Sequence, residues 1–122
     1  MEYPDFTNMS VWKKAIEHLL KIYEITKHFP AEEKFGLTSD MRRAVNSISH
    51  NFAEGFGRFE PRDKTRFYQV SRGSRYELIS QSFASFKLGY IEKKCFGRNN
   101  PENNRNSKRV NIINNFFRKG SR

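Results

Sequence analysis

The sequence predicts an all-α protein folded as an antiparallel up-and-down helical bundle, and three observations lead to that prediction. Apolar residues recur at spacings of three and four, the period of an α-helix, in three long segments between residues 8 and 88. The connections between these segments are short and contain proline or glycine. Long helices joined by short connections pack antiparallel to their neighbours in a bundle.

The first segment covers residues 8–28. Its apolar stripe follows spacings of four, three and four residues: Trp12, Ile16, Leu19 and Tyr23. Asn8 or Ser10 is expected to cap the start, because a side-chain oxygen there accepts a hydrogen bond from a free backbone N–H group. Pro30 ends the segment, because proline cannot continue the hydrogen-bond ladder.

The second segment opens at Thr38 and Ser39, two expected caps, and ends near Gly55 and Gly57. Its apolar stripe consists of Met41, Val45, Ile48 and Phe52. A second stripe on the same segment is polar and consists of Arg43, Ser47, Asn51, Glu54 and Arg58. This polar stripe is the feature of the sequence most in need of a functional explanation.

The third segment begins at Pro61, which suits a first helical turn, and ends with Lys87 and Gly89, a cation followed by a left-handed cap. Two strips run along it, one with Tyr76, Ile79, Phe83, Phe86 and Tyr90, the other with Phe67, Val70, Ser74, Leu78 and Gln81. A helix that is apolar on two sides is usually the most buried helix of a bundle. We therefore expect this segment to be the most buried one.

The basic residues are distributed unevenly along the chain. The net charge is +10, but residues 1–92 hold 14 Lys and Arg against 12 Asp and Glu, whereas residues 93–122 hold 9 against one. Residues 99–106 are rich in asparagine and show no helical stripe. The sequence thus predicts a helical bundle domain over residues 1–92 and an irregular basic tail over residues 93–122. This distribution weakens the interpretation of the total charge as a nucleic-acid signature.

Several classes of protein are disfavoured by composition. No run approaches the 18 apolar residues of a membrane-spanning helix, and the N-terminal residues lack the pattern of a signal peptide. The single cysteine, Cys95, cannot form an internal disulfide. A cytoplasmic protein without a membrane association is expected.

The sequence contains no recognisable catalytic arrangement. The three histidines, His18, His28 and His50, are too scattered for a metal site, and Cys95 has no activating partner beyond two neighbouring lysines. The acids form no pair with a catalytic context. We therefore expect no enzymatic activity, no metal and no cofactor. A nuclease ranks third among the functional hypotheses, because it usually needs an acid cluster that binds metal.

A resemblance to a known family rests on residues spread over positions 6–90 in the family's order and spacing. They are Val11-Trp12-Lys13-Lys14-Ala15, Ile22-Tyr23, Phe29-Pro30, Phe35-Gly36-Leu37, Arg42-Arg43-Ala44-Val45, Ser47-Ile48, Asn51-Phe52-Ala53-Glu54-Gly55-Phe56-Gly57-Arg58, Gly73-Ser74, Glu77-Leu78 and Leu88-Gly89-Tyr90. With these residues the chain resembles the four-helix-bundle proteins of 23S rRNA intervening sequences, which are related to the accessory variability protein of diversity-generating retroelements.

The resemblance implies a homopentamer and an adaptor that engages nucleic acid and a reverse-transcriptase-like protein. For most of the family no biochemical activity is established. The family would continue near Cys95 into a fourth amphipathic helix, which is degenerate here. A reading-frame shift after Cys95 is one hypothesis for it, because reading A/T-rich codons one base later from Phe96 can restore such a helix.

Two interpretations of the polar stripe remain open. In the structural one, which is favoured, a hydrogen-bond network involving Asn51, Glu54, Ser74 and Glu77 sets the register of the helices or subunits. In the functional one, the guanidinium groups of Arg42, Arg43, Arg58 and Arg75 bind phosphates of RNA or DNA. The leading function is an oligomeric, non-enzymatic adaptor that binds protein, nucleic acid or both. The alternative is direct RNA or DNA binding through a basic surface.

Overall fold

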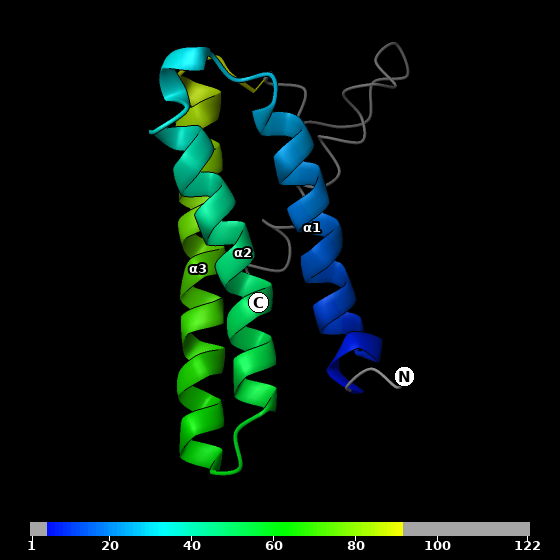
Figure 1. The fold of residues 1–122 in the computed structure, drawn as a ribbon. Helices are drawn as coiled ribbons and strands as arrows, with labels where there is room; N and C mark the ends of the chain where they lie inside the picture. Colours follow the sequence, from blue (N-terminus) through cyan, green and yellow to red (C-terminus); the bar gives the residue numbers. More distant parts are fainter. Residues whose placement is uncertain (1–4, 92–122) are drawn as a thin grey trace.

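The computed structural model describes residues 5–91. Within that range all regular secondary structure is helical: α1 spans Ser10–Thr26, α2 spans Leu37–Phe56 and α3 spans Pro61–Lys87, with short 3-10 helices η1 (Asp5–Asn8) and η2 (Ala31–Glu33). Successive helices run in opposite directions (Figure 1). The all-α prediction is therefore confirmed for these residues. The expected fourth helical segment lies outside the described residues.

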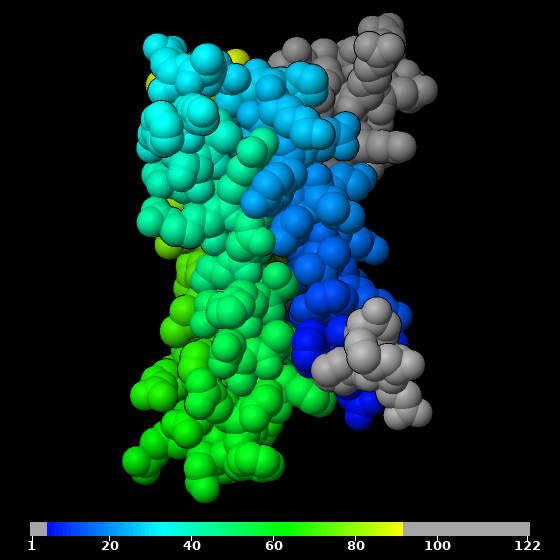
Figure 2. Space-filling view, in the orientation of Figure 1, coloured from blue at the N-terminus to red at the C-terminus, as the bar shows by residue number. Residues whose placement is uncertain are grey.

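The central element is α2, against which both other helices pack. α3 lies beside α2 along its length, and α1 lies along another side of it, while α1 and α3 make little contact with each other (Figure 1). The α2–α3 pair extends past the N-terminal end of α1, which leaves the lower part of the pair uncovered by α1 in the space-filling view (Figure 2). The three helices thus form an open arrangement around α2.

The core gathers where the end of α1, the start of α2 and the end of α3 meet. Ile22, Met41, Val45 and Leu78 are completely buried there, one or two from each helix. Phe29 and Ile91, from the segments that follow α1 and α3, close this end of the core. Met41 and Val45 come from the apolar stripe predicted for the second segment, and Leu78 comes from one of the two strips predicted for the third. Ile22 lies beside the stripe predicted for the first segment.

The expectation that α3 would be the most buried helix is wrong. Its buried residues are Ser74, Leu78, Ser82 and Ser85. Tyr76 and Phe83, from the predicted aromatic strip, remain 42% and 46% exposed. Small serine side chains let α3 lie close to α2, so the serine face turns inward and the larger aromatic residues lie on the flanks.

The helix starts differ from those predicted. Neither Asn8 nor Ser10 caps α1: Met9 occupies the N-cap position without a side-chain hydrogen bond. Likewise α2 begins at Leu37, and Gly36 rather than Thr38 or Ser39 is its N-cap. The backbone N–H of Leu37 instead donates to Oε1 of Glu33, 3.2 Å away. The preceding 3-10 helix η2 therefore supplies the capping oxygen that the sequence suggested would come from a local hydroxyl.

The predicted boundaries of α3 are confirmed. Pro61 occupies the first turn, and Gly89 adopts the left-handed conformation with φ of 83°. The N–H of Tyr90 donates to the carbonyl of Ser85 at 2.9 Å, and that of Gly89 donates to Phe86 at 3.0 Å. These two bonds satisfy carbonyl groups that the end of a helix leaves open, in the Schellman pattern.

Candidate functional site

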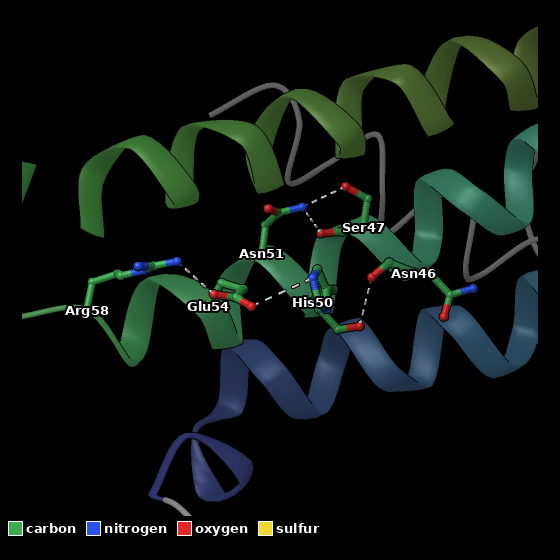
Figure 3. Close-up of polar contacts among 7 residues, drawn as sticks. Asn46, Ser47, His50, Asn51, Glu54 and Arg58 are labelled. Carbon is green, nitrogen blue, oxygen red and sulfur yellow. Dashed lines mark hydrogen bonds and ion pairs between the residues drawn. The ribbon is translucent and has the colours of Figure 1, made fainter. Parts of the chain in front are cut away.

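The candidate site is the polar face of α2 with the turn that follows it, and Figure 3 shows its C-terminal part. Asn46, Ser47, His50, Asn51, Glu54 and Arg58 follow one another along this face at helical spacing (Figure 3). Ser47 and Asn51 point towards α3, whereas His50 lies on the side of α2 nearer α1 (Figure 3). The face therefore divides into a part that packs and a part that is open to solvent.

The part that packs holds α2 in register with α3. The hydroxyls of Ser47 and the buried Ser74 share a hydrogen bond of 2.7 Å. Nδ2 of Asn51 donates to the same hydroxyl of Ser47 at 2.8 Å and to its carbonyl at 2.9 Å. One turn earlier on α3, the hydroxyl of Ser71 donates to the carbonyl of Ile48 at 2.7 Å. These bonds place polar atoms of both helices at fixed positions in the interface.

The solvent-exposed part carries ion pairs along α2 and the turn that follows it. Oε2 of Glu54 lies 3.3 Å from the guanidinium of Arg58, and its other oxygen lies 4.0 Å from Nε2 of His50. Near the start of the helix, Arg43 pairs with Asp40 at 3.0 Å. Exposed pairs of this kind contribute at most about 1 kcal/mol each to stability. These ion pairs accordingly contribute little to the stability of the fold. The Arg58 guanidinium also lies 4.7 Å from the centre of the Phe67 ring of α3.

Arg42, one residue away from Arg43, has a structural position instead. Its guanidinium lies 4.6 Å from the centre of the Tyr23 ring. Nε of Arg42 donates to the hydroxyl of Thr26 at 2.9 Å, and a second nitrogen donates to the Tyr23 carbonyl at 3.3 Å. Asn46 adds a bond of 2.8 Å to the hydroxyl of Tyr23. Arg42 therefore joins α2 to the last turn of α1.

Arg75 lies in a different place from the other predicted arginines. It lines a groove with residues of α1 and with Ile48 of α2. Partial burial lowers the pKa of the Arg75 guanidinium from its ordinary value, and the Tyr76 hydroxyl opposes that shift. The direction shows that this cation has lost part of its hydration.

The predicted residues are thus only partly brought together. Of the four predicted phosphate ligands, Arg43 and Arg58 share the polar face of α2, while Arg42 and Arg75 lie elsewhere. Of the predicted network, Asn51 and Ser74 meet through Ser47. The other two members have only local partners: Glu54 accepts from Arg58 in the turn after α2, and Glu77 accepts from the amide of Gln81 at 3.2 Å.

The structure also adds residues that the sequence did not assign to this site. Phe6 and Trp12 border a surface hollow of about 650 Å³, together with Arg43, Asn46 and His50 of α2. The two rings meet edge to face, with centroids 5.7 Å apart. Trp12 falls on the apolar stripe of α1, so its spacing indicated a core position. No periodic signal marks Phe6, because it precedes α1 in the short helix η1.

Three aromatic residues around the turn between α2 and α3 lie outside the apolar stripes: Phe56, Phe59 and Tyr68. Of these three, only Phe59 is almost fully exposed, at 96%. Phe56 packs edge to face on Phe6, and Tyr68 stacks on Phe52 with ring centroids 5.4 Å apart. The lower end of the α2–α3 pair is thus held by aromatic contacts.

Two further findings concern metal binding and membrane-spanning helices. Between residues 5 and 91, no three His, Cys, Asp or Glu side chains are grouped so that they would hold a metal ion. Among the helices of the same range, none is both long and apolar enough to cross a membrane.

The fold and the site together define a small helical-bundle protein with a polar central helix. A model of the family described as 23S rRNA-intervening sequence protein matches residues 7–112. The chain belongs to this family. The match extends beyond Cys95, near which the resemblance was expected to stop. No curated protein matches the chain.

Proposed function

We propose that this protein is a non-enzymatic, cytoplasmic adaptor that assembles into a homo-oligomer, a pentamer by family resemblance, and binds other macromolecules. The observation that carries the proposal is the aromatic flank of α3. Tyr76, Ile79 and Phe83 follow at spacings of three and four, and the first and last stay 42% and 46% exposed. Apolar side chains gathered on one exposed flank are typical of interaction surfaces.

The polar atoms of the candidate site support a binding role. Its hydrogen bonds and ion pairs connect neighbouring helices or successive turns, as expected for a scaffold. The family resemblance implies RNA or DNA and a reverse-transcriptase-like protein as partners. We propose these two classes of macromolecule as the partners of the adaptor.

Light scattering of the purified chain, coupled to size-exclusion chromatography, tests the oligomer. We expect one discrete oligomeric mass, and we expect the double change Tyr76→Glu and Phe83→Glu to shift it to the monomer. Phe35→Glu is the matched control, because Phe35 is 87% exposed and lies outside the helices. A wild-type monomer, or an unchanged mass in the double variant, would contradict the role of this flank.

Direct nucleic-acid binding is the second candidate, favoured by the arrangement of Arg43 and Arg58. Both side chains lie on the exposed part of the α2 face. His50 and Ala53 line both the hollow beside Phe6 and a second hollow beside Arg58, so the two hollows are neighbours. Exposed arginines with bordering aromatic rings suit single-stranded RNA or DNA.

This candidate is tested by fluorescence anisotropy of a labelled single-stranded RNA at increasing salt. Phosphate contacts predict that the logarithm of the binding constant falls linearly with the logarithm of salt concentration. Arg43→Glu with Arg58→Glu should weaken binding and reduce that slope. Lys13→Glu with Lys27→Glu, at two exposed positions outside the α2 face, is the charge-matched control. Equal losses in both variants would indicate attraction to net charge and would contradict a site on α2.

A further inference from the structure

The hollow beside Phe6 and Trp12 has a volume of about 650 Å³, within the range of small-molecule binding sites, about 300–1,000 Å³. Its lining comes from η1, the first turn of α1 and the polar face of α2. Two aromatic rings, two side-chain amides, a guanidinium and an imidazole contribute to it: Phe6, Trp12, Asn46, Asn51, Arg43 and His50. The hollow thus combines an aromatic border with polar atoms.

The two rings on the border form a corner. Phe6 and Trp12 meet at an interplanar angle of 72° with ring centroids 5.7 Å apart, and Phe6 also meets Phe56 edge to face at 5.8 Å. Phe6 is therefore held in place between two other rings. Two steeply inclined rings let a planar group stack on one of them while its edge meets the other. The border suits a flat aromatic occupant such as a nucleobase.

The amides of Asn46 and Asn51 are oriented by the protein itself. Nδ2 of Asn46 donates to the hydroxyl of Tyr23 and to the carbonyl of Arg42, both at 2.8 Å. Nδ2 of Asn51 donates to the carbonyl of Ser47 at 2.9 Å and to its hydroxyl at 2.8 Å (Figure 3). An amide nitrogen has two hydrogens, so each side chain offers its Oδ1 oxygen to an occupant, as a hydrogen-bond acceptor. The hollow therefore favours an occupant with donors on its edge.

The nucleobases differ in the donors that they carry. Adenine, cytosine and guanine have exocyclic amino groups, whereas uracil and thymine have a carbonyl oxygen where cytosine has its amino group. A carbonyl oxygen placed against Oδ1 of an asparagine would leave two acceptors facing each other without a hydrogen, which is unfavourable. The hollow should therefore distinguish cytosine from uracil, two rings of the same size.

The cations of the same face fit the phosphates beside such a base. Arg43 lines the hollow, its side chain is 74% exposed, and it pairs with Asp40 at 3.0 Å. Exposed pairs of this kind are weak, so the guanidinium can turn to a phosphate. Arg58 lines the neighbouring hollow, and most of the length of α2 separates it from Arg43. This separation favours an extended strand over a single nucleotide.

We propose that the hollow beside Phe6 and Trp12 is a subsite for one base of a single-stranded nucleic acid, and that it prefers a base with an exocyclic amino group. The base stacks in the aromatic corner, its amino group donates to the Oδ1 atoms of Asn46 and Asn51, and an adjoining phosphate lies beside Arg43. The proposal rests on direct nucleic-acid binding, the second candidate function, and adds base selection to it.

The experiment uses the full chain with fluorescein-labelled oligocytidine and oligouridine of equal length. Both strands carry the same number of phosphates, so attraction to net charge is the same for both. Fluorescence anisotropy should show that oligocytidine binds at least about fivefold more tightly, because only cytosine donates an amino group to the two acceptors. Oligodeoxycytidine and oligothymidine repeat the comparison for DNA, and a preference in either pair supports the subsite and identifies its strand. Equal affinities within both pairs would contradict base selection.

Variants of the chain locate the subsite. Asn46→Leu should remove the preference for cytosine and retain binding of oligouridine, whereas Gln69→Leu, an exposed amide of α3 outside the hollow, should keep the preference. Phe6→Leu should weaken oligocytidine by about fivefold through lost stacking. Phe59→Leu makes the same change at a position that is 96% exposed and outside the hollow, and it should have no effect. Circular dichroism checks that the variants fold. An unchanged preference in Asn46→Leu, or equal effects of the two phenylalanine changes, would overturn the proposal.

The outcomes also separate base selection from the function on which it rests. If all strands bind equally and Arg43→Glu with Arg58→Glu weakens all of them, the α2 face binds phosphates and base selection is wrong. If no strand binds the wild-type chain, direct nucleic-acid binding is itself wrong. Light scattering on the same samples tests another occupant, a second copy of the chain. A changed oligomeric mass in Asn46→Leu with an unchanged base preference would show that a second copy covers the hollow, and would overturn the proposal.

Discussion

The two interfaces of α2 are built from different chemistry. Against α1, the contact is apolar and is completed by Arg42 stacked on Tyr23. Against α3, much of the contact consists of serines, with Ser47 bonded to Ser74. Apolar burial supplies free energy without direction, whereas hydrogen bonds at short separation fix the positions of both helices. The comparison suggests that the first interface mainly stabilises the fold and that the second mainly sets its register.

The largest effect is expected from a change in the apolar interface. Ile22 is completely buried, so Ile22→Ala should lower the free energy of unfolding by roughly 2–5 kcal/mol, through lost burial and a residual cavity. Urea denaturation followed by circular dichroism measures this loss. Leu20→Ala is the matched control on the same helix, since Leu20 is 63% exposed. Equal losses at the two positions would contradict the core assignment.

A smaller loss is expected at Gly55, where the end of α2 lies close to α3. A Cβ atom on Gly55 would lie 2.6 Å from Cε1 of Tyr68 and 3.2 Å from the carbonyl of Lys64. Gly55→Ala should therefore destabilise the chain by about 1–3 kcal/mol, despite the helix preference of alanine. The measurement is the midpoint of thermal unfolding.

Gly57→Ala supplies the comparison for Gly55, because its nearest contact to an added Cβ would be 3.6 Å, with the carbonyl of Glu54. Its φ of −78° suits alanine. We expect this change to be neutral or to stabilise by up to about 1 kcal/mol. If alanine has the same effect at both positions, close approach of the helices does not explain why position 55 needs a glycine.

The serine interface is tested by a double-mutant cycle. Ser47→Ala and Ser74→Ala should each cost about 1 kcal/mol, and the double variant should lose less than the sum, because the two changes remove one shared hydrogen bond. Chemical denaturation of the four proteins gives the coupling. Ser80→Ala, exposed on the same helix, should have little effect. Strict additivity would show that the bond does not couple the helices.

The smallest effect concerns Tyr90, which joins the end of α3 to the connection between α1 and α2. Its hydroxyl donates to Oε2 of Glu33 at 2.7 Å. This hydrogen bond, with burial and the charges of Glu33 and Glu32, raises the pKa of Tyr90 above its ordinary value of 10.0. Because the folded-state pKa is the higher one, the stabilisation is complete below pH 10 and is lost as pH rises through the folded-state pKa.

Ultraviolet titration measures this shift. Subtracting the curve of Tyr90→Phe from that of the wild type isolates the ionisation of Tyr90, which should occur above pH 10.0. Glu33→Gln should move it back towards the ordinary value, because a neutral acceptor replaces a negative one. An unchanged difference curve in Glu33→Gln would contradict the assigned cause.

Local signals in the sequence predicted the helices well and their packing less well. Pro61 and Gly89 act on their own backbone, so the ends of α3 agree with the prediction. The start of α2 does not, because its capping oxygen comes from Glu33 in a separate helical turn. The burial of α3 was also misjudged, because an apolar strip indicates preference for a core without showing which neighbour is available.

The candidate site shows the same difference between local signals and packing. Arg42 and Arg43 are adjacent and chemically identical, and the sequence offered no reason to separate them. In the fold, the 100° turn between them directs Arg42 onto Tyr23 and leaves Arg43 on the open face. Likewise, the spacing of Asn51 and Glu54 suggested that both belong to one network. Only Asn51 does, because its side chain donates to Ser47, and Ser47 is bonded to Ser74.

By itself, the sequence determined the all-α class and the three helices with their approximate limits, because periodicity and backbone restrictions act over a few residues. It also carried the family resemblance that the family model confirms. The tertiary structure alone decided that α2 is central, that serines rather than aromatic residues face it from α3, and that α1 and α3 border a groove. These features depend on how closely two helices can approach, and that distance is set by side chains far apart in the chain.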